Sequence, residues 1–319
     1  MYKRISIFLL LTVGAVIPTY GQSSCADLIS ATQSGDLNAM EKFFNEGVNP
    51  NCVYQVKNGP RTALNAAARE DQLDAAKLLL KAGAKVDLRG KGDATALIAA
   101  ARNGHTDVAM LLLKNGAKAN RNISGDGNAL ISAAKAGDFE LSTALIAYGA
   151  KVKSNVAGDG TPLIAAVNGG NAAVVKLFLK KGANPNRSSD GDGSPLIMAV
   201  KKGNIDMVKY LIEEGAYVNK GVNGDASPLI MAAKNGHIQI IELLIEEGAQ
   251  VNKEVPGDET PLIAAAWNGH LEAVKLLIAK GADINFFTRE NGEIRSPLRM
   301  ARKEGHLAIV EYLSKQGAK

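Results

Sequence analysis

Residues 257–285 read GDETPLIAAAWNGHLEAVKLLIAKGADIN, and this stretch describes two short helices joined by a turn. Thr260 followed by Pro261 is typical of a helix start, because threonine caps the first amides and proline suits the first helical position. The apolar residues of 262–266 recur at helical spacing, and the alanines among them let a neighbouring helix approach closely. A second apolar helix follows and ends at Gly281, where glycine readily adopts a left-handed conformation.

The same arrangement recurs along the chain. Gly-Ala pairs mark the end of each second helix at a constant spacing of 33 residues, and they begin at Gly83, Gly116, Gly149, Gly182, Gly215, Gly248 and Gly281. Gly-Asp pairs keep the same step and begin at Gly92, Gly125, Gly158, Gly191, Gly224 and Gly257. Because two independent markers stay in register, the 319-residue chain is predicted to form one elongated domain of stacked repeats.

A third marker, Thr or Ser followed by Pro-Leu, opens five of the units, at Thr161, Ser194, Ser227, Thr260 and Ser296. With the 33-residue period it resembles the ankyrin family, whose unit carries Thr-Pro-Leu-His-x-Ala and packs two antiparallel helices beside a β-turn. The resemblance implies an all-α solenoid with β-turn or hairpin loops over residues 22–319. About nine helix-turn-helix units are expected, near 26–51, 59–87, 92–120, 125–153, 158–186, 191–219, 224–252, 257–285 and 292–319.

The chain departs from the ankyrin pattern in several places. The helix starts at Thr62, Thr95 and Asn128 lack the proline, and the connections 51–62 and 285–296 are three residues longer than their equivalents. The first and last units are irregular, as expected of repeats that cover the ends of a stack. The family's histidine is replaced by isoleucine, which exchanges a polar contact for an apolar one, at Ile98, Ile131, Ile164, Ile197, Ile230 and Ile263.

The N-terminus reads as an export signal. Lys3 and Arg4 precede an apolar run over 5–17 that is shorter than the ~20 residues of a membrane-spanning helix, which is the alternative interpretation. Thr19 and Gly21, three residues and one residue before the cleavage point, suit cleavage between Gly21 and Gln22. Lipid attachment at Cys25 is the other alternative, but the residues before it do not form a typical lipoprotein signal. We therefore expect residues 1–21 to be removed and the mature protein to be periplasmic or secreted, with no later membrane segment.

Composition and motifs disfavour several classes of function. The net charge of +5, about +3 without the signal segment, is too small to predict nucleic-acid binding. The histidines share one repeat position, and no sequence motif of a hydrolase, a zinc peptidase or a phosphate-binding loop is present, so we expect no enzyme and no cofactor. The Asp of each Gly-Asp pair is interpreted as a turn residue, so no metal site is predicted.

One position near the end of each first helix indicates a binding surface. The ankyrin resemblance places it on the concave face, where partner proteins bind in this family. Stacked side chains there would form a row of cations that attracts an acidic protein, or else an ordinary solvated helix face. A lone tryptophan in this row would serve as an interface anchor. The row consists of Arg69, Arg102, Lys135, Asn168, Lys201, Lys234, Trp267 and Lys303.

The mature chain keeps two cysteines, Cys25 before the first helix and Cys52 just after the first unit. In an oxidising compartment they could form a disulfide that stabilises the N-terminal unit, and two unpaired thiols are the alternative.

Two hypotheses for function follow. The first is a scaffold or chaperone that holds a periplasmic protein as a monomer. The second is a regulator or inhibitor that covers the active site of a periplasmic or secreted enzyme or toxin. The sequence does not identify the partner, because a shared fold specifies a mode of binding and not its target.

Overall fold

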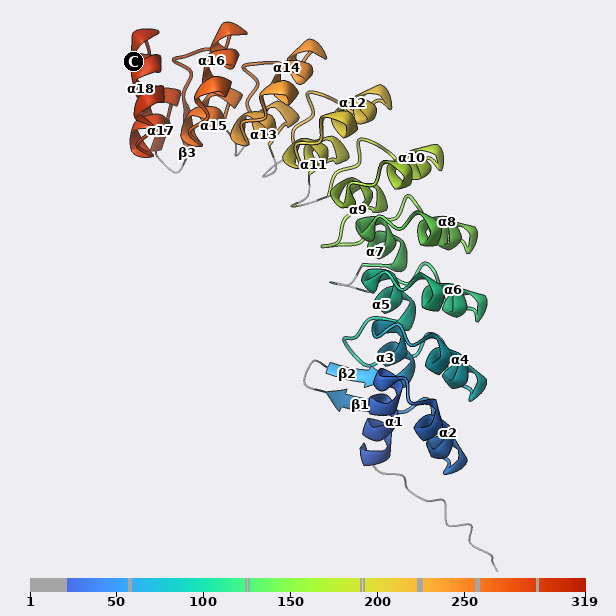
Figure 1. Cartoon of the computed structure of the whole chain (residues 1–319). Coiled ribbons are helices and arrows are strands. Elements are labelled where there is room, and N and C mark those ends of the chain that lie inside the picture. The colour runs from blue at the N-terminus through green and yellow to red at the C-terminus, as the bar shows by residue number, and fades with distance from the viewer. Residues whose placement is uncertain are drawn as a thin grey trace, which may run out of the picture.

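The computed structural model describes residues 22–56, 59–123, 125, 127–189, 191, 193–222, 226–255, 259–290 and 293–319. The segment 1–21, where the export signal is predicted, lies outside this range. Within it, eighteen helices form nine antiparallel pairs stacked into an arc, as Figure 1 shows. This arrangement confirms the all-α solenoid of helix-turn-helix units.

The pairs consist of a first and a second helix. The first helices are α1 (Gln22–Ser34), α3 (Ala63–Arg69), α5 (Ala96–Asn103), α7 (Ala129–Ala136), α9 (Pro162–Gly169), α11 (Pro195–Lys201), α13 (Pro228–Lys234), α15 (Pro261–Trp267) and α17 (Pro297–Lys303). The second helices are α2 (Leu37–Asn45), α4 (Leu73–Lys81), α6 (Thr106–Lys114), α8 (Phe139–Ala147), α10 (Ala172–Lys180), α12 (Ile205–Glu213), α14 (Ile238–Glu246), α16 (Leu271–Ala279) and α18 (Leu307–Lys315).

Every first helix from α3 onward begins with the same side-chain cap. In α15 the hydroxyl of Thr260 accepts a hydrogen bond from the amide of Ile263, and Pro261 occupies the first helical position. Asn128 caps α7 in the same way, although no proline follows it. The cap alone therefore fixes where these helices begin, and proline is an addition in the later units.

The two longer connections form β-hairpins. Strands β1 (Val53–Val56) and β2 (Gly59–Thr62) pair antiparallel before α3, and β3 (Thr288–Glu290) pairs with β4 (Glu293–Arg295) before α17. Four of the shorter loops contain one isolated bridge each among their described residues, for example Ile123 with Gly127. The three additional residues thus give each hairpin enough length to form a ladder.

One continuous apolar core runs along the stack between the two helical layers. Alanines of the first helices are almost fully buried, and larger residues of the second helices, such as Leu112 and Phe178, fill the space behind them. Each isoleucine at the position of the family's histidine is also buried; Ile230, for example, packs with Val255 of the next loop and Ala264 of the next helix. Apolar contact therefore replaces the polar one between repeats, as the sequence predicts.

A ladder of asparagine side chains joins neighbouring units behind the Gly-Ala pairs. Asn219 donates to the carbonyl of Gly248 at 2.8 Å and accepts from the amide of Gln250 at 2.8 Å. The same double bond pattern recurs from Asn51, Asn120, Asn186 and Asn252. We call these residues the asparagine ladder. Their side chains satisfy backbone groups that would otherwise lack partners between repeats.

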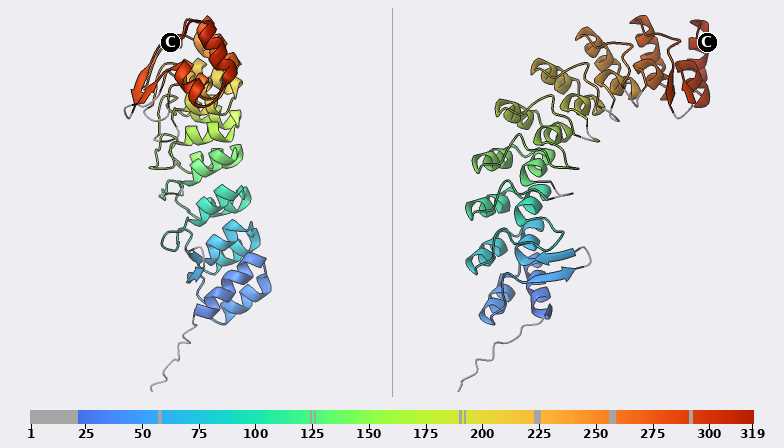
Figure 2. Two further views of the ribbon diagram at one scale, coloured as in Figure 1. Left: turned by 90° about the vertical axis from the view of Figure 1, so that its left-hand side faces the viewer. Right: turned by 180° about the vertical axis from the view of Figure 1, so that it is seen from behind.

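The arc has an inner and an outer face. The first helices and the loops and hairpins line the inner, concave side, whereas the second helices lie on the outer side (Figure 1 and Figure 2). Among the described residues, no helix is long and apolar enough to cross a membrane.

Candidate functional site

The row of residues predicted to bind a partner lies in the last turn of the first helices, along the concave side of the arc. We call it the concave row. Five of its members are exposed: Arg102, Lys135, Lys201, Lys234 and Lys303. The other three are half-buried: Arg69, Asn168 and Trp267.

Arg69 does not present a free charge. Its guanidinium donates to a carboxylate oxygen of Asp93 in the next loop at 2.7 Å, and also to the side-chain oxygen of Asn65 at 2.8 Å. Asp93 in turn accepts from the amide of Ala94 at 3.0 Å, as expected of a turn residue. The concave row and the row of Gly-Asp pairs are therefore joined here across a repeat boundary.

Lys303 is also paired. Its ammonium group donates to both carboxylate oxygens of Glu293 in strand β4, at 2.9 and 3.1 Å. That hydrogen bond from Lys303, together with its charge, holds the pKa of Glu293 below the ordinary value for glutamate. The C-terminal end of the concave row is thus partly neutralised.

Trp267 is not the exposed anchor that the sequence suggests. The guanidinium of Arg295 lies over its ring, 4.7 Å from the centroid, and its indole N–H donates to Glu304 at 3.1 Å. Arg295 itself forms an ion pair with Glu259. Because Arg295 of the last hairpin covers the ring, Trp267 stabilises the contact between the last unit and the rest of the stack. Less of its surface is therefore accessible to a partner.

The middle of the concave row retains its charge. Lys135, Lys201 and Lys234 are exposed, and the side-chain ammonium group of none of them forms a hydrogen bond or an ion pair with the residues that the structure describes. Cations without local partners create a positive field that is available to an approaching molecule. These three lysines are the part of the predicted site that keeps its expected character.

A hollow of about 500 Å³ opens on the concave face between α5, α7 and α9. Its described lining includes Arg102, Ser132, Lys135, Asp159 and Asn168. It lies where the residues facing the concave side are small, Ser132 in α7 and Ala165 in α9, while the equivalent positions of α11 and α13 carry Met198 and Met231. The sequence does not single out this hollow, because small residues also occupy this position in α3, α5 and α15, and the cavity forms only when the helices stack.

The histidines have structural roles. His105 and His306 each direct a ring nitrogen at a main-chain carbonyl of the preceding unit, that of Ala68 at 3.0 Å and that of Trp267 at 2.9 Å. His270 reaches Lys234 in the same way at 3.0 Å. No group of three His, Cys, Asp or Glu side chains in the described chain could hold a metal ion.

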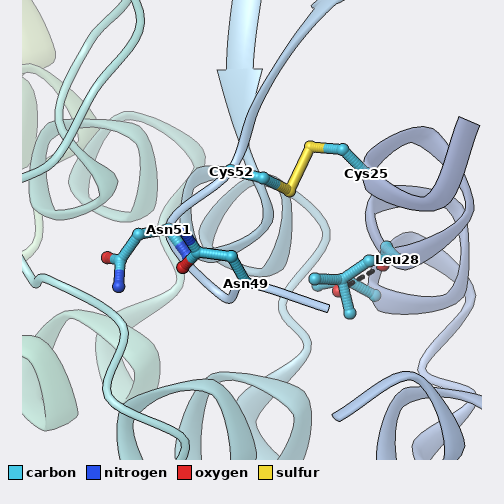
Figure 3. Close-up of a disulfide and its surroundings, with 6 residues drawn as sticks. Cys25, Leu28, Asn49, Asn51 and Cys52 are labelled. Carbon is cyan, nitrogen blue, oxygen red and sulfur yellow. Dashed lines mark hydrogen bonds between the residues drawn. A yellow bond between two sulfur atoms is a disulfide. The ribbon is translucent and has the colours of Figure 1, made fainter. Parts of the chain in front are cut away.

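Cys25 and Cys52 lie together at the N-terminal end. Figure 3 shows their sulfur atoms bonded between α1 and the start of the first hairpin, with 5.9 Å between the Cα atoms. Cys25 is 7% exposed and belongs to the apolar core of the first unit. The bond links α1 to the segment just before β1. In the described chain, this first unit has a neighbouring unit on one side only.

The comparisons with known proteins agree with the geometry. A family model described as ankyrin repeats in three copies matches residues 28–123, 130–222 and 219–288. A second, described as ankyrin repeats in many copies, matches residues 269–313. No match to this chain was found among curated proteins. Ankyrin repeats are in general non-catalytic modules that mediate contacts between proteins, and the matches cover most of the nine helix pairs. The chain therefore belongs to the ankyrin-repeat family.

Proposed function

We propose that this chain is an exported scaffold that holds a partner protein against its concave face. The observation that carries the proposal is the set of exposed lysines Lys135, Lys201 and Lys234, whose ammonium groups have no partner among the described residues, in the middle of a continuous concave surface. Positive charge concentrated on one face raises the association rate of a negatively charged molecule. The partner we infer is a protein with an acidic surface.

The asparagine ladder supports a role in binding rather than a role that requires the units to move relative to one another. Five of the units are bound to the next by paired side-chain hydrogen bonds such as those of Asn219, besides the shared apolar core. A surface held in place before binding loses less conformational freedom when the partner docks.

Export is the second part of the proposal. The charged start and apolar run of residues 1–21 motivate it, and a bond between Cys25 and Cys52 suits an oxidising compartment. N-terminal sequencing of the protein purified from its source should find Gln22, or a residue close to it, as the first residue, in the soluble periplasmic or secreted fraction. An intact Met1 on membrane-bound protein would contradict export.

The binding role is tested by charge reversal. Lys135, Lys201 and Lys234 are replaced together by Glu, and the matched control replaces Lys81, Lys114 and Lys180, exposed lysines at the ends of outer helices. Each protein is used to capture partners from a periplasmic extract, and the protein that the wild type retains is then measured by surface plasmon resonance at two salt concentrations.

The concave variant should lose the captured protein and its salt-dependent association rate, while the control variant should keep both. Circular dichroism spectra of all three proteins should coincide, since exposed substitutions change stability by only about 0.5 kcal/mol each. Equal capture by the two variants would exclude the concave lysines as the binding surface. If the captured protein is an enzyme, a loss of its activity in the complex would identify an inhibitor rather than a chaperone.

A further inference from the structure

The hollow between α5, α7 and α9 contains polar side chains that have no partner within the described structure. The hydroxyl of Ser132 is one: this residue is 9% exposed, lines the hollow, and its oxygen makes no hydrogen bond there. The ammonium of Lys135 and the amide of Asn168 are equally without partners among the described residues. These groups line the open hollow, so each of them is available to a ligand that enters it.

These groups share one chemical property, which is that all three can donate a hydrogen bond. Lys135 adds a positive charge, and the Ser132 hydroxyl and the Asn168 amide are neutral donors. A carboxylate accepts several hydrogen bonds at once, and its bonds to charged donors are about twice as strong as neutral ones. The set therefore suits one carboxylate better than a cation or an apolar group.

Asp159 limits what the hollow accepts. One of its carboxylate oxygens accepts from the amide of Gly127 at 3.1 Å, which holds this acid in the loop at the rim of the hollow. A second negative charge close to Asp159 would be repelled, so a single carboxylate near Lys135 is favoured over a pair of acidic groups. The remainder of the lining includes Ile131 and Ile164, which can contact the methylene groups of a glutamate side chain.

We propose that this hollow is a subsite for one glutamate side chain of the partner, held by Lys135, Ser132 and Asn168. The proposal rests on the proposed binding function and names the group that the partner inserts. Ser132 also differs from its equivalents, which are alanine in α3, α5, α9 and α15 and methionine in α11, α13 and α17.

The subsite is tested with a small probe and without the partner. The uniformly 15N-labelled mature chain is titrated with the peptide acetyl-Gly-Glu-Gly-amide while amide chemical shifts are recorded, and the same titration is repeated with acetyl-Gly-Gln-Gly-amide, which has the same shape and no charge. The glutamate peptide should produce saturable shifts confined to residues 131–136 and 164–168, and the glutamine peptide should bind about tenfold more weakly.

Three variants locate the site. Ser132→Met places in the hollow the side chain that α11 and α13 carry at this position and should abolish the saturable shifts, and Lys135→Gln should weaken binding about tenfold. The matched control is Lys114→Gln, which removes an exposed lysine at the end of the outer helix α6 and should leave binding unchanged. A spectrum that otherwise overlays on that of the wild type shows that each variant is folded.

Equal binding of the two peptides, or shifts spread over Lys201 and Lys234 as much as over Lys135, would overturn the subsite. Unchanged binding by Ser132→Met would overturn it as well. These outcomes are separable from the proposed function, because a captured partner that depends on the three lysines can still bind by general attraction when the peptide finds no subsite.

Discussion

Arg69 and Asp93 form an ion pair across a repeat boundary, with 2.7 Å between the guanidinium nitrogen and the carboxylate oxygen. The side chain of Arg69 is 29% exposed and that of Asp93 is 10% exposed, so the pair is shielded from solvent more than a typical surface pair. One residue belongs to a first helix and the other to the next loop. The pair therefore couples the stability of two neighbouring units.

A double-mutant cycle should detect this coupling. Arg69→Met and Asp93→Asn, alone and together, should give a coupling free energy of about 1–2 kcal/mol, because the pair is partly buried and hydrogen-bonded. The measurement is urea unfolding followed by circular dichroism. Lys77 and Asp74 provide the matched control, since their 2.8 Å pair is more than half exposed on both sides and should couple by less than about 0.5 kcal/mol. Equal coupling in the two cycles would contradict a special role for Arg69.

The asparagine ladder is interrupted twice, at Asp87, which accepts from the amide of Lys118 but cannot donate to the next unit, and at Lys153. Its equivalents Asn120 and Asn186 each bond the next unit twice, but a lysine cannot accept from the amide that the ladder leaves for it. Lys153→Asn should therefore stabilise the protein, by about 1–2 kcal/mol if two net hydrogen bonds form. The inverse variant Asn219→Lys should destabilise it by a similar amount. Urea unfolding of both variants gives the measurement, and a lower stability for Lys153→Asn would show that the break is compensated by other contacts.

The sequence predicted the fold because the same motifs recur in many units and can be compared with one another. Each helix start, glycine end and Gly-Asp turn occurs many times in register, so errors at one unit are corrected by the others. The sequence also showed that the connections 51–62 and 285–296 are longer than the others. That these extra residues pair into β-hairpins is seen only in the structure. Helix starts without proline, at Thr62 for example, are capped like the others because the side-chain oxygen is sufficient.

The sequence predicted the site less completely, because contacts between units depend on how far each unit is displaced along the stack. Arg69 and Asp93 lie 24 residues apart, and this separation has no meaning until the stacking brings the loop over the helix. The burial of Trp267 depends on Arg295, which belongs to the last hairpin. Ser132 differs from alanine by one oxygen, and its importance appears only when the hollow around it is seen.

The disulfide between Cys25 and Cys52 should stabilise the N-terminal unit. Thiol counting on the native protein should find no free cysteine, and reduction should lower the melting temperature. Closing the chain between Cys25 and Cys52, 27 residues apart, should stabilise the folded state by about 3–4 kcal/mol in the chain-entropy model. The double variant with serine at both positions is the control and should be insensitive to the reductant. Two reactive thiols in the unreduced wild type would refute the bond.

Loss of the bond should also act locally. Helix α1 packs against α2 and α3 and has no unit on its other side in the described chain, so it depends on fewer contacts than an internal helix. Hydrogen exchange of the reduced protein should accelerate in α1 and α2, and far less in α9 and α10 near the middle of the stack. Uniform acceleration along the arc would show that the units unfold together.

The last prediction concerns the helix starts that lack proline. Five first helices have proline at their first position, and α7 has Ala129 there, after the cap residue Asn128. Asn128 has an extended conformation, with φ −138° and ψ 171°, which is the conformation that a residue before proline prefers. The amide at the first helical position has no acceptor within the helix, so proline removes no helical hydrogen bond.

Ala129→Pro should therefore stabilise the protein by about 0.4–1 kcal/mol, because it restricts the unfolded chain without changing the folded one. Pro162 is buried at the equivalent position of α9, so the fold has already accommodated this ring. The control is Ala133→Pro, in the interior of the same helix, which should destabilise by about 3 kcal/mol or more because it removes a helical hydrogen bond. Both effects are measured by urea unfolding. A loss of stability in Ala129→Pro would mean that the backbone at the start of α7 differs from that at the start of α9. The two units would then not be equivalent at this position.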